Sequence, residues 1–267
     1  MENKQLIDKV FDIARLAGAA ILDIYQNGDF GETAKADQSP LTKADLASHR
    51  MIVEGLARET PDIPVLSEEA ADISFPERSQ WQRFWLVDPL DGTKEFIKRN
   101  GEFTVNIALV ENGQPVLGVV YAPVLDVGYL GQNGSEAYVV RNSQPAQTIA
   151  VKLPVPGEPV KVVASRSHSD ARTEQLLARL GDYTCVSMGS SLKLCLVAEG
   201  KANFYPRLGP TMEWDTAAAH AVVRAAGGRV CDLKGVELRY NKQDLHNPEF
   251  LVLPSGDDGM LSRLGLS

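Results

Sequence analysis

The segment Trp85 to Thr93, WLVDPLDGT, constrains the fold of this chain more than any other stretch. Its apolar residues 85–87 are typical of the end of a buried strand. Pro89 cannot donate a hydrogen bond to a neighbouring strand, so the pattern predicts that the strand ends there. The chain should therefore turn at an acidic residue, Asp88.

Two carboxylates and a carbonyl lie close together in this turn. Asp88 and Asp91 are three residues apart, and a tight turn ending in Gly92 could aim both side chains and the Leu90 carbonyl at one point. Hard divalent cations prefer such oxygen clusters. Asp, Pro and Gly are also ordinary turn residues, so a plain surface turn remains an alternative.

A second acidic pair follows another short apolar strand. Glu68 and Glu69 come directly after Val65 and Leu66, as Asp88 comes after the strand at 85–87. Parallel pairing of the two strands would place Glu68 near Asp88. Adjacent glutamates more often mark a solvated loop, and this reading stays open.

Three predicted helix starts carry further polar residues. Thr42 can cap a helix over 43–59 with Asp45 at its third position, where the acid could also be only a favourable charge at the helix end. Gly189 to Ser191 precede a helix through Glu199, whose free N–H groups and Lys193 could bind an anion or form an ordinary cap. Asp215 lies where an N-cap would be in a helix ending at Ala226.

The remaining pattern divides into two halves. Helices are expected over 4–25 and 43–59, then a meander of strands over 103–110, 116–121, 129–130 and 137–140, with a turn at Asn112-Gly113. Residues 151–159, rich in proline, predict a linker that separates an N-terminal α+β half (1–150) from a C-terminal α/β half (151–267). The second half starts with a strand, helix and strand over 160–164, 170–180 and 185–188 and ends in short closing strands over 229–253. Residues 27–40 are expected to form a loop or short hairpin, and residues 71–83 an exposed insertion.

Composition limits the classes of partner. The 267 residues suit one large domain or two packed halves, and 44% are apolar. A net charge of -8, from 35 acidic and 27 basic residues, argues against a nucleic-acid polymer but not against a small phosphorylated ligand. The three cysteines are expected to be reduced core residues. Without an apolar leader or a long apolar run, a soluble, cytoplasmic protein is expected.

Several strings together resemble a known family. WLVDPLDGT, SEEA, SPLTKAD and WDTAAAHAVVRAAGG are similar to motifs of the inositol monophosphatase superfamily of metal-dependent, lithium-sensitive phosphatases. SRSH, GSSLKLCLVAEG and YPRLGPT are similar to its CysQ branch of 3′(2′),5′-bisphosphate nucleotidases. The resemblance runs from about residue 4 to residue 240 and implies an α/β fold, a layered αβαβα sandwich of the inositol monophosphatase and sugar phosphatase type.

The resemblance also implies site residues. Two or three Mg²⁺ ions would be held by carboxylates and one carbonyl: Glu68, Asp88, Leu90, Asp91 and Asp215. Asp45 and Thr93 would orient the attacking water, and Glu69 is a candidate second base. The substrate would be contacted by the metal ligands Glu68, Leu90, Asp91 and Asp215, by Gly92 and Thr93, and, at the nucleotide end, by Ser165, His168, Ser190, Lys193 and Arg207. His168 could equally be a plain surface histidine.

The implied reaction is hydrolysis of adenosine 3′,5′-bisphosphate (PAP) to AMP and phosphate, or of its sulfated form PAPS to APS, in sulfur assimilation. An inositol monophosphatase or a sugar bisphosphatase would keep the metal residues and differ at the nucleotide end. A metal-gated nucleotide-binding protein without turnover is the non-enzyme alternative, which the presence of Asp45 and Thr93 disfavours. The sequence leaves open a monomer or homodimer, and a peripheral association with the inner face of the cell membrane.

Overall fold

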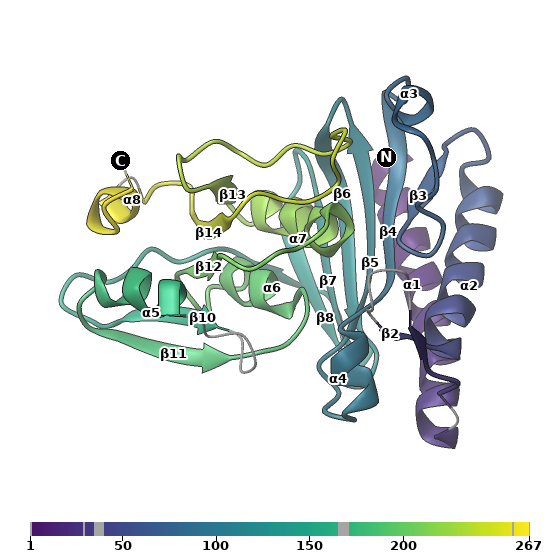
Figure 1. Ribbon diagram of the computed structural model, residues 1–267, viewed down its shortest axis with the longest axis horizontal. Helices are drawn as coiled ribbons and strands as arrows, with labels where there is room; N and C mark the ends of the chain where they lie inside the picture. Colours follow the sequence, from purple (N-terminus) through teal and green to yellow (C-terminus); the bar gives the residue numbers. More distant parts are fainter. Residues whose placement is uncertain (1, 29, 35–39, 165–170, 258, 267) are drawn as a thin grey trace.

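Helices and sheets alternate in layers in the computed structural model, which describes residues 2–28, 30–34, 40–164, 171–257 and 259–266 (Figure 1). Helices α1 (Glu2–Asn27) and α2 (Lys43–Glu59) cover one face of a seven-stranded sheet. Helices α6 (Leu192–Ala198) and α7 (Glu213–Ala225) lie on the other face, between this sheet and the smaller sheets of the second half. The αβαβα sandwich expected from the sequence is thereby confirmed.

The large sheet is a meander with one parallel edge. Its strands pair in chain order, and only the β3–β4 pair is parallel. The predicted hairpin at Asn112-Gly113 joins β5 to β6. The strands are β3 (Val65–Ser67), β4 (Arg83–Asp91), β5 (Thr104–Glu111), β6 (Gln114–Ala122), β7 (Val127–Gln132), β8 (Ala137–Arg141) and β9 (Gln147–Ile149). A separate pair, β1 (Thr33–Ala34) and β2 (Pro40–Leu41), precedes α2.

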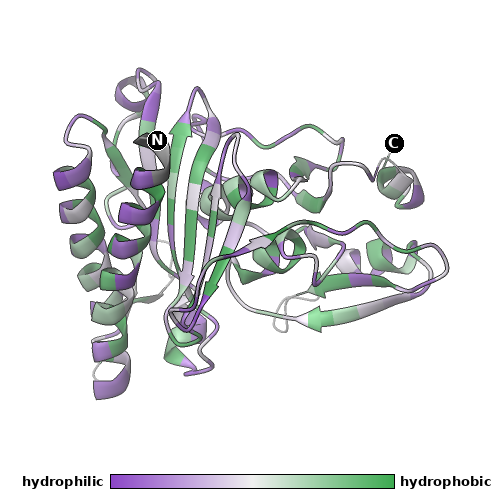
Figure 2. Cartoon of the chain, turned by 180° about the vertical axis from the view of Figure 1, so that it is seen from behind, coloured by the Kyte–Doolittle hydropathy of each residue, from purple (hydrophilic) through white to green (hydrophobic). Residues whose placement is uncertain are grey.

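The side chains of β4 point alternately to the two faces of the sheet, and this explains why both faces are covered by helices. Trp85 and Val87 belong to the core under α1 and α2, whereas Phe84 and Leu86 belong to the core under α6 and α7. Successive side chains of a strand point to opposite faces, so a continuous apolar run requires cover on both sides. Apolar residues accordingly dominate the central strands in Figure 2.

The second half begins with the predicted α/β unit. Strands β10 (Val160–Ala164) and β11 (Tyr183–Ser187) are parallel and are joined through α5 (Ala171–Ala178). A three-stranded antiparallel sheet follows, of β12 (Tyr205–Arg207), β14 (Phe250–Pro254) and β13 (Gly228–Asp232). The chain ends with α8 (Gly259–Arg263), which the sequence pattern did not predict. Among the described helices, none is long and apolar enough to cross a membrane.

Helix α7 lies unusually close to the sheet because two glycines face it. A Cβ at Gly118 would lie 2.0 Å from the Ala218 carbonyl oxygen, and one at Gly131 would lie 2.4 Å from the Val222 Cα. The alanines of α7 allow the same approach from the helix side. This contact fixes the position of the helix that carries Asp215.

Three expectations were wrong. Strand β4 does not end at Pro89 but continues to Asp91, through a register shift between Asp88 and Asp91 that accommodates the missing N–H. Residues 71–83 are not simply exposed, because they contain the short helix α3 (Phe75–Arg78) and Arg78 is only 3% exposed. Cys185 is exposed rather than a core residue, since β11 is a strand of a two-stranded sheet. Cys195 and Cys231 are buried as expected.

Candidate functional site

Three carboxylates converge where β4 ends and α7 begins. One oxygen from each of Asp88, Asp91 and Asp215 lies within 4.8 Å of the others. Asp88 and Asp91 come from the irregular end of β4, and Asp215 is the third residue of α7. The expectation that Asp215 is the N-cap was wrong, because the helix begins two residues earlier and Met212 is its N-cap. The structure therefore brings together three of the predicted metal ligands from distant parts of the chain.

Local hydrogen bonds shape the end of β4. The Leu90 N–H donates to Asp88 Oδ1 at 3.0 Å, and the Ser48 hydroxyl of α2 donates to the Pro89 carbonyl at 2.6 Å. Gly92 then takes φ 93°, a left-handed conformation that favours glycine, and begins α4 (Thr93–Ile97). The chain that follows the turn therefore starts as a short helix.

The electrostatics of the carboxylates fit a cation. Burial first, and then the charges of Glu68, Asp91 and Asp215, raise the pKa of Asp88 well above its usual range. Burial and the charge of Asp91 raise the pKa of Asp215 to about 8. Buried like charges repel one another unless protons or a cation neutralise them. An all-oxygen donor set of this charge suits a hard divalent ion.

Glu68 lies beside this triad of carboxylates. The predicted parallel pairing of β3 and β4 is present, with Ser67 opposite Val87, and the Glu68 N–H donates to the Val87 carbonyl at 3.1 Å. A hydrogen bond between the Glu68 and Asp88 side chains contributes to the raised pKa of Asp88. Glu69, the candidate base, is half-buried in the turn that follows.

The hydrogen bonds to the Asp91 carboxylate go to one of its two oxygens. Its Oδ2 accepts hydrogen bonds from the Ser190 hydroxyl at 2.5 Å, the Ser191 N–H at 2.7 Å and the Ser191 hydroxyl at 2.8 Å. Thr104 and Asn106 of β5 add longer contacts to the same oxygen, at 3.5 and 3.4 Å. The hydrogen bonds that the described residues make to Asp91 thus converge on Oδ2, and Oδ1 is the oxygen left for a cation.

Sequence reasoning missed three residues of this network. Ser191 is 1% exposed, and its hydroxyl also lies 2.6 Å from the Asp215 carbonyl oxygen and 2.8 Å from Asn106 Nδ2. Thr104 bonds to Asn106 and to Ser190. The available signal was a pair of polar residues, Thr104 and Asn106, at alternate positions of an otherwise apolar strand. Such a pair faces one side of the sheet and needs buried partners.

Asp45 and Thr93, the pair predicted to orient the water, lie close together. The capping box at α2 is present, with Asp45 Oδ2 accepting from the Thr42 N–H at 2.8 Å and from the Thr42 hydroxyl at 2.5 Å. The Thr93 hydroxyl lies 3.3 Å from Asp45 Oδ1 and 3.4 Å from the Leu90 carbonyl oxygen. Asp45 is 1% exposed. It therefore caps a helix and also reaches the end of β4.

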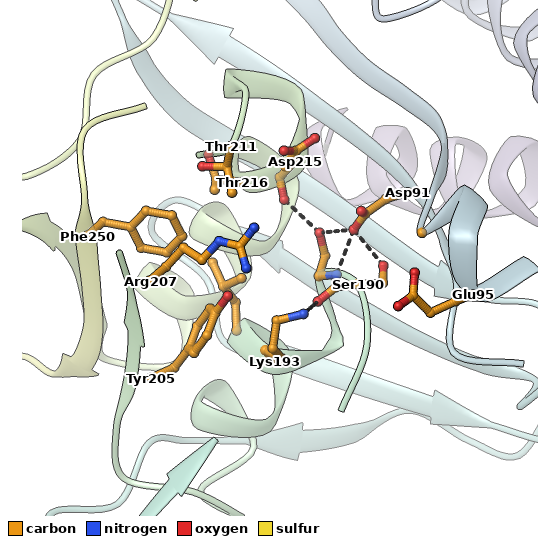
Figure 3. A pocket seen from close by; sticks show the side chains of 13 residues that line it. Asp91, Glu95, Ser190, Lys193, Tyr205, Arg207, Thr211, Asp215, Thr216 and Phe250 are labelled. Carbon is orange, nitrogen blue, oxygen red and sulfur yellow. Dashed lines mark hydrogen bonds between the residues drawn. The ribbon is translucent and has the colours of Figure 1, made fainter. Parts of the chain in front are cut away.

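A cavity of about 130 Å³ opens beside the carboxylates (Figure 3). Its walls include Asp91 and Asp215 and two cations, Lys193 and Arg207. Lys193 is 7% exposed, its Nζ donates to the Ser190 carbonyl at 2.7 Å, and burial lowers the pKa of Lys193 to about 8. Arg207 donates to the Pro210 carbonyl at 3.0 Å. With a cation bound to the carboxylates, the cavity would match an anion that carries negative charge at both ends.

Other predicted nucleotide contacts are partly placed. Ser190 lines the cavity and adopts φ 53°, which is uncommon outside glycine and frequent at functional sites. Tyr205 and Phe250 add an aromatic wall, with ring centroids 5.9 Å apart. Ser165 and His168 lie outside the described residues, so their roles stay predictions.

Known proteins resemble the chain over nearly its whole length. A 3′(2′),5′-bisphosphate nucleotidase CysQ of Escherichia coli O157:H7 is 52% identical over 252 residues, which are 92% of this chain and 99% of that protein. CysQ of Haemophilus influenzae is 36% identical and covers 94% of this chain and 93% of its own. The crystal structure of CysQ from Bacteroides thetaiotaomicron superposes with a TM-score of 0.82 at 45% identity, over 95% of this chain and 98% of that one. An inositol monophosphatase from Anabaena gives a TM-score of 0.76 at 26% identity, over 99% and 97%.

A sequence profile decides the family. The profile of the inositol monophosphatase family matches residues 2–260. The match spans every element that contributes to the carboxylate site, from α2 and β4 to α7. The chain belongs to the inositol monophosphatase family.

Proposed function

We propose that this protein is a Mg²⁺-dependent 3′(2′),5′-bisphosphate nucleotidase that hydrolyses adenosine 3′,5′-bisphosphate to AMP and phosphate in sulfur assimilation. PAPS, hydrolysed to APS, is a second substrate of the same chemistry. One observation carries the proposal: two carboxylates of the triad, Asp91 and Asp215, line a cavity that is also lined by the cations Lys193 and Arg207. The names of the 36–52% identical CysQ relatives support the same substrate.

The carboxylates would hold the metal. Glu68, Asp88 and Asp91, together with the Leu90 carbonyl and Asp215, would bind two or three Mg²⁺ ions. Bound there, the ions would supply Lewis-acid stabilisation of the charge that develops on the phosphoryl and leaving oxygens.

Residues of the chain would orient the water molecule that attacks phosphorus. The Thr93 hydroxyl, which donates to Asp45 Oδ1 at 3.3 Å, would accept a hydrogen bond from a water and orient that water for attack on phosphorus. The P–O3′ bond then breaks, and the ribose oxygen leaves with a proton as the free hydroxyl. Gly92 and Thr93 at the start of α4 would contact the phosphate oxygens. Glu69 is a secondary candidate for moving the proton.

The two cations would select the second phosphate. Lys193, fixed by its bond to the Ser190 carbonyl, and Arg207 would contact the 5′-phosphate, a group that inositol monophosphates lack. Ser190 would present its backbone to the nucleotide. The aromatic wall of Tyr205 and Phe250 is available to the adenosine.

A phosphate-release assay tests the proposal. The purified protein would be given PAP, PAPS, inositol 1-phosphate and fructose 1,6-bisphosphate, each with Mg²⁺ and each with EDTA. Release that depends on Mg²⁺ and is fastest with PAP is expected. If the protein hydrolyses inositol 1-phosphate or fructose 1,6-bisphosphate faster than PAP, its activity is that of an inositol monophosphatase or a sugar bisphosphatase. PAP binding without release would favour a metal-gated nucleotide-binding protein.

A further inference from the structure

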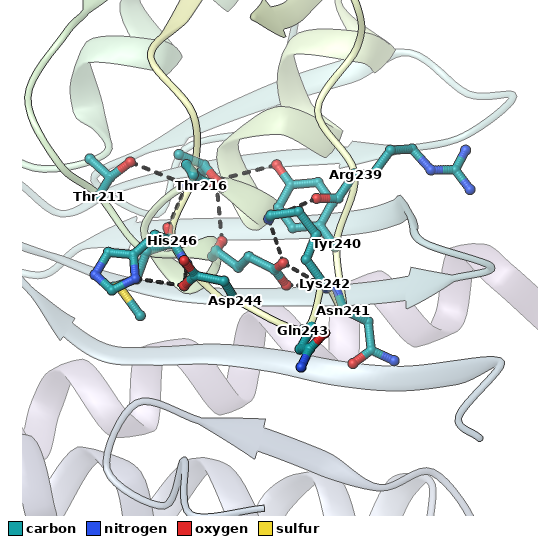
Figure 4. Close-up of polar contacts among 12 residues, drawn as sticks. Thr211, Thr216, Arg239, Tyr240, Asn241, Lys242, Gln243, Asp244 and His246 are labelled. Atoms are coloured by element: carbon teal, nitrogen blue, oxygen red, sulfur yellow. Dashed lines mark hydrogen bonds and ion pairs between the residues drawn. The ribbon is translucent and has the colours of Figure 1, made fainter. Parts of the chain in front are cut away.

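Two segments without an expected role in the site are bound to each other near the carboxylates. One contains α3 and Arg78. The other is residues 239–247, here called the strap, which form neither helix nor strand and run past the N-terminal end of α7 (Figure 4). We propose that Arg78 and Glu213 are positioning residues. Arg78, from α3, and Glu213, from α7, bind the strap from two sides and thereby hold Asp215 opposite Asp88 and Asp91.

Arg78 binds the strap from the N-terminal side. Its Nη1 lies 3.0 Å from Asn241 Oδ1 and 2.5 Å from the Lys242 carbonyl oxygen, and its Nη2 lies 2.8 Å from the Gln243 carbonyl oxygen. In return, Asn241 Nδ2 donates to the Arg78 carbonyl at 2.6 Å. The guanidinium is 3% exposed and lies 5.0 Å from the centre of the Phe75 ring. These acceptors are an amide oxygen and two backbone carbonyls, all neutral, so the buried charge is shared among several groups of the strap.

Glu213 binds the strap from the α7 side. Its side chain is fully buried and accepts from the Asn241 N–H at 2.6 Å, the Lys242 N–H at 3.0 Å and Lys242 Nζ at 2.5 Å. Asn241 and Lys242 therefore lie between Arg78 and Glu213 and bond to both. The strap has no sheet ladder at this point, and these two side chains satisfy its backbone groups instead.

The rest of the strap fixes the first turn of α7. The Glu213 N–H donates to the Leu245 carbonyl at 2.9 Å, and Asn247 Nδ2 donates to the Met212 carbonyl at 2.6 Å. The Met212 N–H in turn donates to Asp215 Oδ2 at 2.8 Å. A displacement of the strap would therefore move the peptide that orients the Asp215 carboxylate.

The packing supports the same coupling. Ala71, Ile73 and Trp81, from the segment around α3, pack against the core cluster that contains Leu238 and Tyr240. Arg78 follows Glu68 by ten residues in a segment that starts at the metal-binding edge of the sheet. The clamp thus connects the chain beside Glu68 to the chain beside Asp215. Partners that hold metal ligands in place typically change metal affinity about 10- to 100-fold when removed.

Titration of the metal-free protein with Mn²⁺ tests the clamp, because Mn²⁺ accepts the same oxygen ligands as Mg²⁺ and its free-ion EPR signal reports binding without turnover. Arg78→Ala is expected to raise the Kd for Mn²⁺ about tenfold. Arg78→Lys keeps the charge but not the forked geometry, so an intermediate Kd is expected. Arg83→Ala is the matched control, since Arg83 lies in the same part of the chain but pairs with Glu111 at an exposed site.

The outcomes separate the clamp from the proposed function on which it rests. A wild-type protein that binds no Mn²⁺ would overturn the metal site itself. A wild-type protein that binds, with Arg78→Ala folded by near-UV circular dichroism and equal in Kd, would overturn the clamp alone, even if its unfolding temperature were lower. Should Arg78→Ala fail to fold, Asn241→Ala decides the question, because it removes the two side-chain hydrogen bonds to Arg78 and keeps the Asn241 N–H that donates to Glu213. An unchanged Kd in that variant would equally refute the clamp.

Discussion

Replacing Lys193 by alanine should separate recognition of the second phosphate from the metal chemistry. The ammonium is 7% exposed and already held at the Ser190 carbonyl, so little ordering is needed when a phosphate binds. A charge-assisted hydrogen bond of this kind contributes about 1.5–3 kcal/mol, or about 10- to 150-fold in kcat/KM. We expect this loss with PAP and a much smaller loss with adenosine 3′-monophosphate, which lacks the 5′-phosphate.

The pH dependence provides a second measurement on the same residue. Burial lowers the pKa of Lys193 to about 8. The charged form is the lower-pH form, so it predominates by about ten to one at pH 7 and falls to about one in ten at pH 9. The preference for PAP over the monophosphate should therefore decline above pH 8. Lys193→Arg should retain it at pH 9, because a guanidinium stays charged there.

Initial rates of phosphate release with both substrates, from pH 6.5 to 9.5, would give the two ratios. Lys234→Ala, which removes an exposed turn lysine, is the control and should behave as wild type. Equal losses on PAP and the monophosphate in Lys193→Ala would refute the assignment and mean that Lys193 serves the scissile phosphate or the fold. An alkaline decline that persists in Lys193→Arg would show that another group titrates.

The remaining predictions address the metal ligands, the water, the core and the packing of α7. Asp88→Asn removes an anionic ligand and should abolish both Mg²⁺-dependent release and the rise in unfolding temperature with Mg²⁺; turnover at wild-type rates would contradict the metal assignment. Thr93→Ala should lower kcat about 10²- to 10⁴-fold with little change in KM, measured by steady-state kinetics. Burial lowers the pKa of His220 below 6.5, so its contribution to stability is present above pH 6.5 and lost as the pH falls through the lowered pKa. Urea unfolding at pH 7.5 and 5 should show that loss in wild type and a smaller one in His220→Gln. Gly118→Ala should cost about 1–3 kcal/mol in the free energy of unfolding, because the new Cβ would lie 2.0 Å from a carbonyl of α7, whereas Gly256→Ala has open space and should cost little.

Local patterns were enough to predict most elements of the fold. The capping box and apolar periodicity gave both ends of α2, at Lys43 and Glu59, as the structure has them. The Asn112-Gly113 turn fixed the central hairpin. These signals are read within a few residues, and burial of the same faces reinforces them. The division of the chain at residue 150 rests on the proline-rich composition of 151–159 and stays a prediction.

Short elements and long-range contacts could not be predicted in the same way. Helix α8 has five residues, too few to show a period. Asp91 was predicted to be a metal ligand, but its bonds to Ser190 and Ser191 join residues far apart in the chain, and no local pattern encodes them. The same holds for Arg78 and the strap. For the candidate site, sequence reasoning therefore predicted carboxylates that the structure brings together, but not the residues that hold them in place.

The origin of the carboxylates in distant elements has a consequence for how long the protein survives. Asp88 ends a strand of the first sheet and Asp215 starts a helix of the second half, so an unfolded or half-folded chain offers no comparable site. A ligand that binds only the native state stabilises it by mass action, by about 2.7 kcal/mol when its concentration is a hundredfold above Kd. The supply of the bound cation would then set resistance to proteolysis as well as turnover. A shortage of that cation would lower the amount of the protein as well as its activity.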